Sequence, residues 1–204
     1  MERISQLGKA ENVNVLLPVM GEVALLVGFI FVIPSTIMAQ SNWREGAGHL
    51  KLKDRLDRPE DGYCLDVVGS GQHIRFDMPL TAHNCKPGLY ADEAVIMEPD
   101  GTIRFPAYNQ CATVSGVNSR ALPGTAVISA GCGEKTPFLN TKGLQSFTQH
   151  KDGKLELAGT GLCLTVGQES ASTFSLDHRW RPLFVDTCKD VVPARSQWEF
   201  VLFR

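Results

Sequence analysis

Three short segments of this sequence are alike: YCLDV at Tyr63–Val67, QCATV at Gln110–Val114 and LCLTV at Leu162–Val166. In each segment a cysteine is followed by apolar and β-branched residues, which is typical of a short buried strand. The three cysteines lie 47 and 52 residues apart, and a second cysteine follows each of them after 21, 21 and 25 residues. The chain therefore repeats itself three times, with a period of about 50 residues.

A second marker recurs in the same register late in each repeat: EAV at Glu93–Val95, QSF at Gln145–Phe147 and SQW at Ser196–Trp198. Its last residue is always apolar, which favours a role in the core. Short alternating runs and Asp-Gly or Pro-Gly turns separate the markers, and no stretch between them has a useful helical period. One repeat cannot bury its own apolar face, so we expect three to share a core. The sequence thus predicts an all-β fold, a β-trefoil of three repeats.

Composition limits the remaining possibilities. A chain of 204 residues has room for one ordinary domain with an appendage. The formal net charge of −2 lacks the basic excess that a nucleic-acid-binding protein normally shows, so we predict no nucleic-acid partner. The six cysteines fit either a disulfide framework or metal sites, and the cellular compartment has to decide between them.

The appendage is the first 39 residues. Val23–Ala39 contains no charge, Pro34 interrupts it, and small and polar residues follow it. We predict a signal peptide or membrane anchor over residues 1–39, a lead-in over 40–49 and the repeat domain over 50–204; a buried helix is the remaining alternative for the first segment. A secreted or periplasmic protein, or one anchored to a membrane outside the cytosol, meets oxidising conditions, which favour disulfides.

The pattern Cys-Leu-Asp-Val, a second cysteine about twenty residues later and a degenerate Gln-x-Trp, three times over, resembles the ricin B-chain type lectin domain. This resemblance covers roughly residues 50–204. It implies a carbohydrate-binding protein without catalysis or cofactor, and one disulfide within each repeat. The implied pairs are Cys64–Cys85, Cys111–Cys132 and Cys163–Cys188. No Cys-x-x-Cys or His-x-x-x-His spacing supports a zinc site, and we predict no metal ligand.

The resemblance also indicates where a sugar would bind. Such a site uses the aspartate of Cys-Leu-Asp-Val, a flat side chain two residues before the second cysteine, and an amide just before the Gln-x-Trp. Only the first repeat keeps the carboxylate, and the predicted carbohydrate-binding residues are Asp66, Thr81, His83, Asp92 and Glu93. Thr113 and Thr165 replace the aspartate in the other repeats, so we expect one competent site at most.

Three carboxylates in one pocket repel each other, so one of them should be protonated, hydrogen-bonded elsewhere or neutralised by a cation. This suggests a preference for an amino sugar or a Ca²⁺-bridged glycan. Asp177–Arg181, in the longer loop of the third repeat, is expected to be solvated, with a second binding surface as the alternative.

A different class of function remains open for the whole domain. A degenerate trefoil can also serve as a protein-interaction or toxin-delivery subunit that binds no sugar and accompanies a separate partner chain. The sequence contains no Gly-x-Ser-x-Gly elbow or phosphate-binding glycine loop, so we do not expect an enzyme.

Overall fold

The computed structural model describes residues 42–118, 120–136, 140–173 and 175–204. The predicted signal peptide or anchor lies outside the described residues. Among the residues that are described, no helix is long and apolar enough to cross a membrane.

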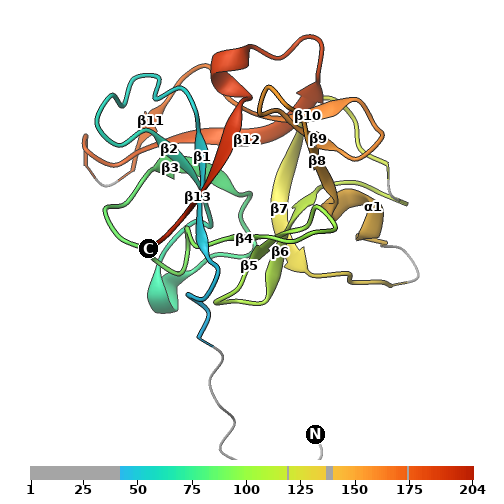
Figure 1. The fold of residues 1–204 in the computed structure, drawn as a ribbon, viewed down its shortest axis with the longest axis horizontal. Helices are drawn as coiled ribbons and strands as arrows, with labels where there is room; N and C mark the ends of the chain where they lie inside the picture. The colour runs from blue at the N-terminus through green and yellow to red at the C-terminus, as the bar shows by residue number, and fades with distance from the viewer. Residues whose placement is uncertain (1–41, 119, 137–139, 174) are drawn as a thin grey trace, which may run out of the picture. The chain divides into compact units, whose positions relative to one another are not determined.

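The described chain is built almost entirely of short antiparallel strands that form three consecutive meanders (Figure 1). The first meander contains β1 (Gly48–Leu52), β2 (Tyr63–Asp66) and β3 (Thr81–Asn84). The second contains β4 (Ile96–Met97), β5 (Ile103–Phe105), β6 (Gln110–Val114) and β7 (Thr125–Gly131). The third contains β8 (Phe147–Gln149), β9 (Leu155–Leu157), β10 (Leu162–Val166), β11 (Ala171–Ser172) and β12 (Arg179–Thr187). The last strand is β13 (Trp198–Leu202); the helical segments are α1 (Lys142–Gln145) and two 3₁₀ turns, Gly71–His73 and Pro193–Arg195.

The first and last strands of the domain pair with each other. β1 and β13 are antiparallel, in register from Gly48↔Leu202 to Leu52↔Trp198. They form the third hairpin of the fold, equivalent to β4–β5 and β8–β9. The first strand begins at Gly48, inside the predicted lead-in, because this hairpin needs the whole of Gly48–Leu52 as a partner for β13.

A set of three equivalent hydrogen bonds shows the pseudo-threefold symmetry. The apolar residue of each second marker donates its backbone N–H to the carbonyl oxygen of a glycine in the preceding hairpin. These bonds are Val95 to Gly48 (2.9 Å), Phe147 to Gly101 (2.9 Å) and Trp198 to Gly153 (2.8 Å). A Cβ at position 101 would lie 2.3 Å from the Phe147 carbonyl oxygen, and Gly101 has a φ of +85°, so the Asp-Gly turn there requires glycine.

The same three marker residues belong to the hydrophobic core. Val95 and Trp198 are fully buried and Phe147 nearly so. Trp198 also donates its indole N–H to the Leu164 carbonyl oxygen at 3.1 Å, so its one polar atom is satisfied inside the core. The core role expected from the degenerate Gln-x-Trp is confirmed.

Each repeat contains one disulfide, as the resemblance implied. The pairs are Cys64–Cys85, Cys111–Cys132 and Cys163–Cys188, with Cα–Cα distances of 5.0, 5.0 and 4.8 Å. With the three meanders and the shared core, they confirm the predicted β-trefoil with one disulfide per repeat.

Candidate functional site

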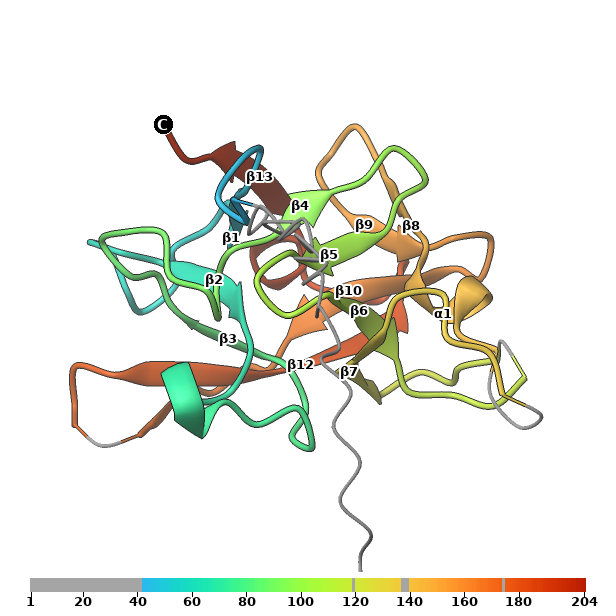
Figure 2. The same ribbon diagram turned by 90° about the horizontal axis from the view of Figure 1, so that it is seen from below.

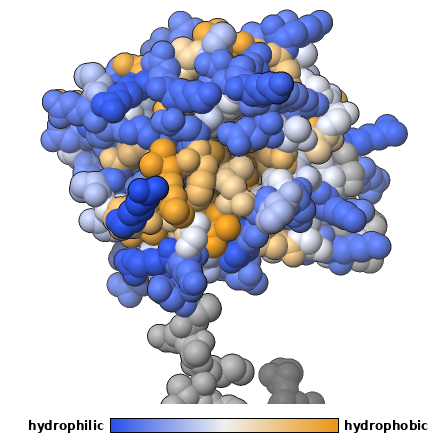
Figure 3. Space-filling model, in the orientation of Figure 1, coloured by the Kyte–Doolittle hydropathy of each residue, from blue (hydrophilic) through white to orange (hydrophobic). Residues whose placement is uncertain are grey.

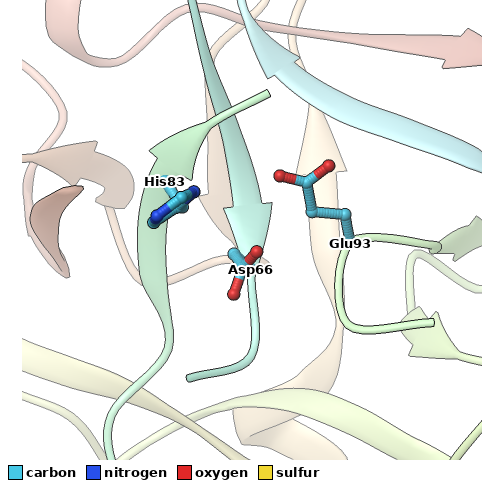
Figure 4. A group of neighbouring side chains, drawn as sticks. All are labelled: Asp66, His83 and Glu93. Atoms are coloured by element: carbon cyan, nitrogen blue, oxygen red, sulfur yellow. The ribbon is translucent and has the colours of Figure 1, made fainter. Parts of the chain in front are cut away.

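The predicted site residues of the first repeat gather around the end of β2. Asp66, the last residue of β2, lies directly opposite Thr81 on β3, and Cys64 lies opposite His83. Residues that face each other across an antiparallel pair project to the same side of the sheet. Figure 4 shows Asp66 between His83 on β3 and Glu93, which comes from the loop before β4. The structure therefore brings Asp66, Thr81, His83 and Glu93 together.

A lysine that was not predicted from the sequence, Lys86, partly neutralises the carboxylates. Lys86 Nζ donates to Asp66 Oδ2 at 2.7 Å and to Asp92 Oδ2 at 2.6 Å, and it lies 3.8 Å from Glu93 Oε1. The lysine side chain is 23% exposed, whereas the three carboxylates are almost completely buried beneath it. The available signal was its position directly after Cys85, close in sequence to two of the acids.

Lys86 weakens the case for an amino sugar or Ca²⁺. The sequence predicted that one acid would be protonated, hydrogen-bonded elsewhere or neutralised by a cation, and the Lys86 ammonium is such a cation within the chain. Asp66, His83 and Glu93 each offer a possible ligand atom, all within 4.8 Å of one another. Lys86 already donates hydrogen bonds to Asp66, a member of this group, and to the neighbouring Asp92, so the geometry gives no reason to add a metal.

Glu93 occupies the place that Gln145 takes in the second repeat. Gln145 Oε1 accepts the N–H of Gly133, the residue after the second cysteine, and Glu93 Oε2 accepts the N–H of Lys86, at 2.8 and 3.1 Å. Gln145 then uses its amide N–H to donate to Thr113 Oγ1 at 2.8 Å. A carboxyl can make the matching contact with Asp66 only if it is protonated.

Burial favours that protonated state. Desolvation raises the pKa of Glu93 to about 8 and that of Asp66 to about 7, although the positive charge of Lys86 opposes both shifts. Among the described residues, the buried Oε1 of Glu93 has no hydrogen-bond partner, and burial raises the pKa of Glu93 further than that of Asp66, so Glu93 is the acid that holds a proton. For Lys86, burial alone would lower the pKa, but the charge of Asp66 and the hydrogen bonds to Asp66 and Asp92 outweigh it and raise the pKa above its ordinary value.

His83 forms the outer side of the group. Its Nδ1 lies 3.0 Å from the Asn84 carbonyl oxygen, which can only accept, so Nδ1 carries the proton. Burial lowers the pKa of His83, and its neutral ring lies 5.7 Å, centroid to centroid, from the ring of His178. His178 belongs to the third repeat, which therefore reaches the site of the first.

The equivalent positions of the other repeats serve the fold. Thr113 Oγ1 donates to the Cys111 carbonyl oxygen at 2.9 Å, and Thr165 Oγ1 donates to the Arg195 carbonyl oxygen at 3.0 Å. Ala130 and Asp186 take the place of His83, and Asp186 Oδ1 accepts the N–H of Thr187 at 2.7 Å. Neither repeat has a carboxylate where Asp66 stands in the first.

The segment Asp177–Arg181 is not simply a solvated loop. β12 begins at Arg179, and Arg181 is buried, with its Nη2 2.6 Å from Asp57 Oδ1 and its guanidinium 5.0 Å from the centre of the Tyr63 ring. Sequence reasoning missed this because the ion pair joins residues 124 positions apart.

No family model matches the chain, and no curated protein sequence matches it. Among solved structures, it is similar to the agglutinin from Abrus precatorius, with a TM-score of 0.51 and 22% identity over 76% of this chain and 47% of the agglutinin. It is also similar to the mdaA-1 domain, with a TM-score of 0.52 and 18% identity over 77% of this chain and 90% of that one. A third structure is the β-trefoil lectin of the Vibrio vulnificus hemolysin/cytolysin with N-acetyl-D-lactosamine bound, with a TM-score of 0.42 and 14% identity over 78% and 96% of the two chains. The chain thus spans about half the length of the agglutinin. The described domain has a ricin B-like β-trefoil fold.

Proposed function

We propose that the protein is a lectin that binds a glycan at the first repeat, through Asp66, Lys86 and Asp92, with Thr81 and His83 beside them. The observation that carries the proposal is the Lys86 cluster, in which one partly exposed ammonium covers buried carboxylates. The proposal assigns the domain a binding role and no catalysis.

The cluster has the chemistry that sugar hydroxyls require. A protonated lysine has three N–H donors, and Asp66 and Asp92 accept two of them. Glu93 Oε1, at 3.8 Å, is too far for a hydrogen bond, so the third donor can point to a ligand. Asp66 and Asp92 have remaining lone pairs that can accept from neighbouring hydroxyl groups.

The fold itself does not require this cluster. Gly133 takes the place of Lys86 in the second repeat, and Thr113 that of Asp66, yet the second repeat forms the same meander with its own disulfide. Burying three carboxylates beside one ammonium carries a desolvation cost that uncharged residues avoid. Groups that are costly for folding and unnecessary for it are candidates for a binding function.

A glycan array followed by calorimetry on the hits tests the proposal. We expect binding by the native protein and at least a tenfold weaker affinity for Asp66→Asn, which keeps the shape of the side chain but removes its charge. The matched control is Asp186→Asn, the same change in the third repeat, which should leave the affinity unchanged. Equal binding by the native protein and Asp66→Asn would show that the glycan does not bind at the first repeat.

Failure to bind any glycan would instead favour the interaction or toxin-delivery subunit. One feature of the surface suits that alternative. Figure 3 shows an apolar area around β13 and β4, and the C-terminal residues Val201, Leu202 and Phe203 are 44, 49 and 46% exposed. A partner chain would bury such a surface.

The proposed setting is outside the cytosol. The three disulfides suit an oxidising compartment, because cytosolic thiols are kept reduced. We extend the proposal to a secreted or periplasmic protein, with a membrane-anchored form facing outside the cytosol as the alternative.

A further inference from the structure

The longer loop of the third repeat lies beside the first-repeat site. The two cysteines of this repeat are 25 positions apart, against 21 in each of the other repeats. The extra length contributes to a two-stranded ribbon in which β11 pairs with β12. The start of β12 pairs in turn with β3, in the register Trp180↔His83, Arg181↔Ala82 and Pro182↔Thr81, and Figure 2 shows the two strands side by side.

This register fixes which side chains join the site. Trp180 lies opposite His83 and Pro182 opposite Thr81, so both project to the side of the sheet that carries Asp66. Arg181, between them, points to the other side and is held there by Asp57 and Tyr63. The buried arginine therefore restricts how β12 can rotate or slide.

His178 is a third ring close to His83. It lies two residues before Trp180, and its ring lies 5.7 Å from that of His83. By the strand register Trp180 lies on the same side as His83, and His178 lies beside His83; we call these three residues the aromatic row. β2, β3 and β12 are consecutive strands of the sheet, spaced about 4.8 Å apart, so Trp180 is anchored about 10 Å from the strand of Asp66. A disaccharide spans that distance, and a single sugar ring does not.

We propose that Trp180 and His178 form a second subsite, which stacks against the next sugar of an oligosaccharide whose terminal sugar is held by Asp66 and Lys86. The apolar face of a pyranose ring stacks on aromatic side chains, and tryptophan offers the widest surface for it. The inference rests on the proposed lectin function and names its substrate class, a glycan of at least two sugar units.

Titration calorimetry with matched pairs of sugars tests the subsite. The probes are galactose and lactose, N-acetylglucosamine and its β1–4 disaccharide, and mannose with its α1–2 disaccharide. For the pair that binds, Trp180→Ala should weaken the disaccharide about tenfold and the monosaccharide less than twofold. Trp43→Ala is the matched control, because Trp43 lies outside the site against Arg44, and it should change neither affinity.

Tryptophan fluorescence keeps the test valid if Trp180→Ala folds poorly. Trp180→Phe retains an aromatic ring, so it should keep most of the affinity for the disaccharide but lose the fluorescence change that the disaccharide causes. An equal loss of affinity for both sugars of a pair, or none, would overturn the second subsite while leaving the first in place. Asp66→Asn should weaken both sugars alike. Absence of binding to all six probes by the native protein would overturn the second subsite, whereas the lectin proposal falls only if the glycan array shows no hit.

Discussion

Replacing Glu93 by glutamine should stabilise the protein, and more so as the pH rises. Burial raises the pKa of Glu93 to about 8 in the folded state, against 4.5 for an exposed glutamate. Between these two values the folded chain binds more protons than the unfolded chain, so the free energy of unfolding falls as the pH rises. Each pKa unit is equivalent to about 1.4 kcal/mol, which gives a loss of about 2–4 kcal/mol between pH 5 and pH 8.

Glu93→Gln removes the need for this proton. Its amide N–H can donate to Asp66 at any pH, as Gln145 donates to Thr113 in the second repeat. We expect the variant to match the native protein near pH 5 and to exceed its free energy of unfolding by about 2–3 kcal/mol at pH 8. Urea titrations followed by tryptophan fluorescence at pH 5, 6.5 and 8 measure this difference.

The control is Glu169→Gln, which makes the same charge change at an exposed position. The stability of this variant should follow that of the native protein at all three pH values. If Glu93→Gln also follows the native curve, or is less stable at pH 8, then Glu93 is ionised in the folded state and the comparison with Gln145 is wrong.

Two further changes test the counterion and the core. Lys86→Met leaves buried carboxylates without their ammonium and should cost about 2–4 kcal/mol in urea unfolding at pH 7.5, and less at pH 5, where added protons relieve the repulsion. Lys142→Met, an exposed lysine in the second repeat, is its control. Trp198→Phe loses the indole hydrogen bond to Leu164 and leaves a small cavity. It should therefore lower the free energy of unfolding by about 1–3 kcal/mol at every pH. Its control is Trp43→Phe, which lies outside the main core and should lower the free energy of unfolding less.

The fold could be read from the sequence because each repeat carries its own copy of the same signals. A cysteine near the start of a buried strand and an apolar residue 31 to 36 positions later recur three times. Their shared register indicates which cysteines pair and which residues meet in the core. Val95 and Trp198 occupy equivalent places although they differ in size, which shows that the position within the repeat decides burial.

The site could be predicted only in part, because two of its features depend on contacts that break the repeat. Lys86 contacts both Asp92, six positions later, and Asp66, 20 positions earlier, and the second contact depends on the fold. Trp180 reaches His83 because an insertion in the third repeat pairs with a strand of the first. Loop length showed that the insertion exists, but it carries no information about the strand with which it pairs.

The charge of the site follows from the proton on Glu93. With Glu93 neutral, Asp66 and Asp92 face the single charge of Lys86, and the cluster carries −1; if all three acids were ionised it would carry −2. A negative site repels acidic sugars at either value and accepts neutral hydroxyl groups, whose binding does not require the cluster to change its charge. The neutral ring of His83 adds no positive charge to attract an acid. Between neutral and acidic glycans, this arrangement of charges therefore favours the neutral ones, and sialylated glycans should be absent from the hits of the array.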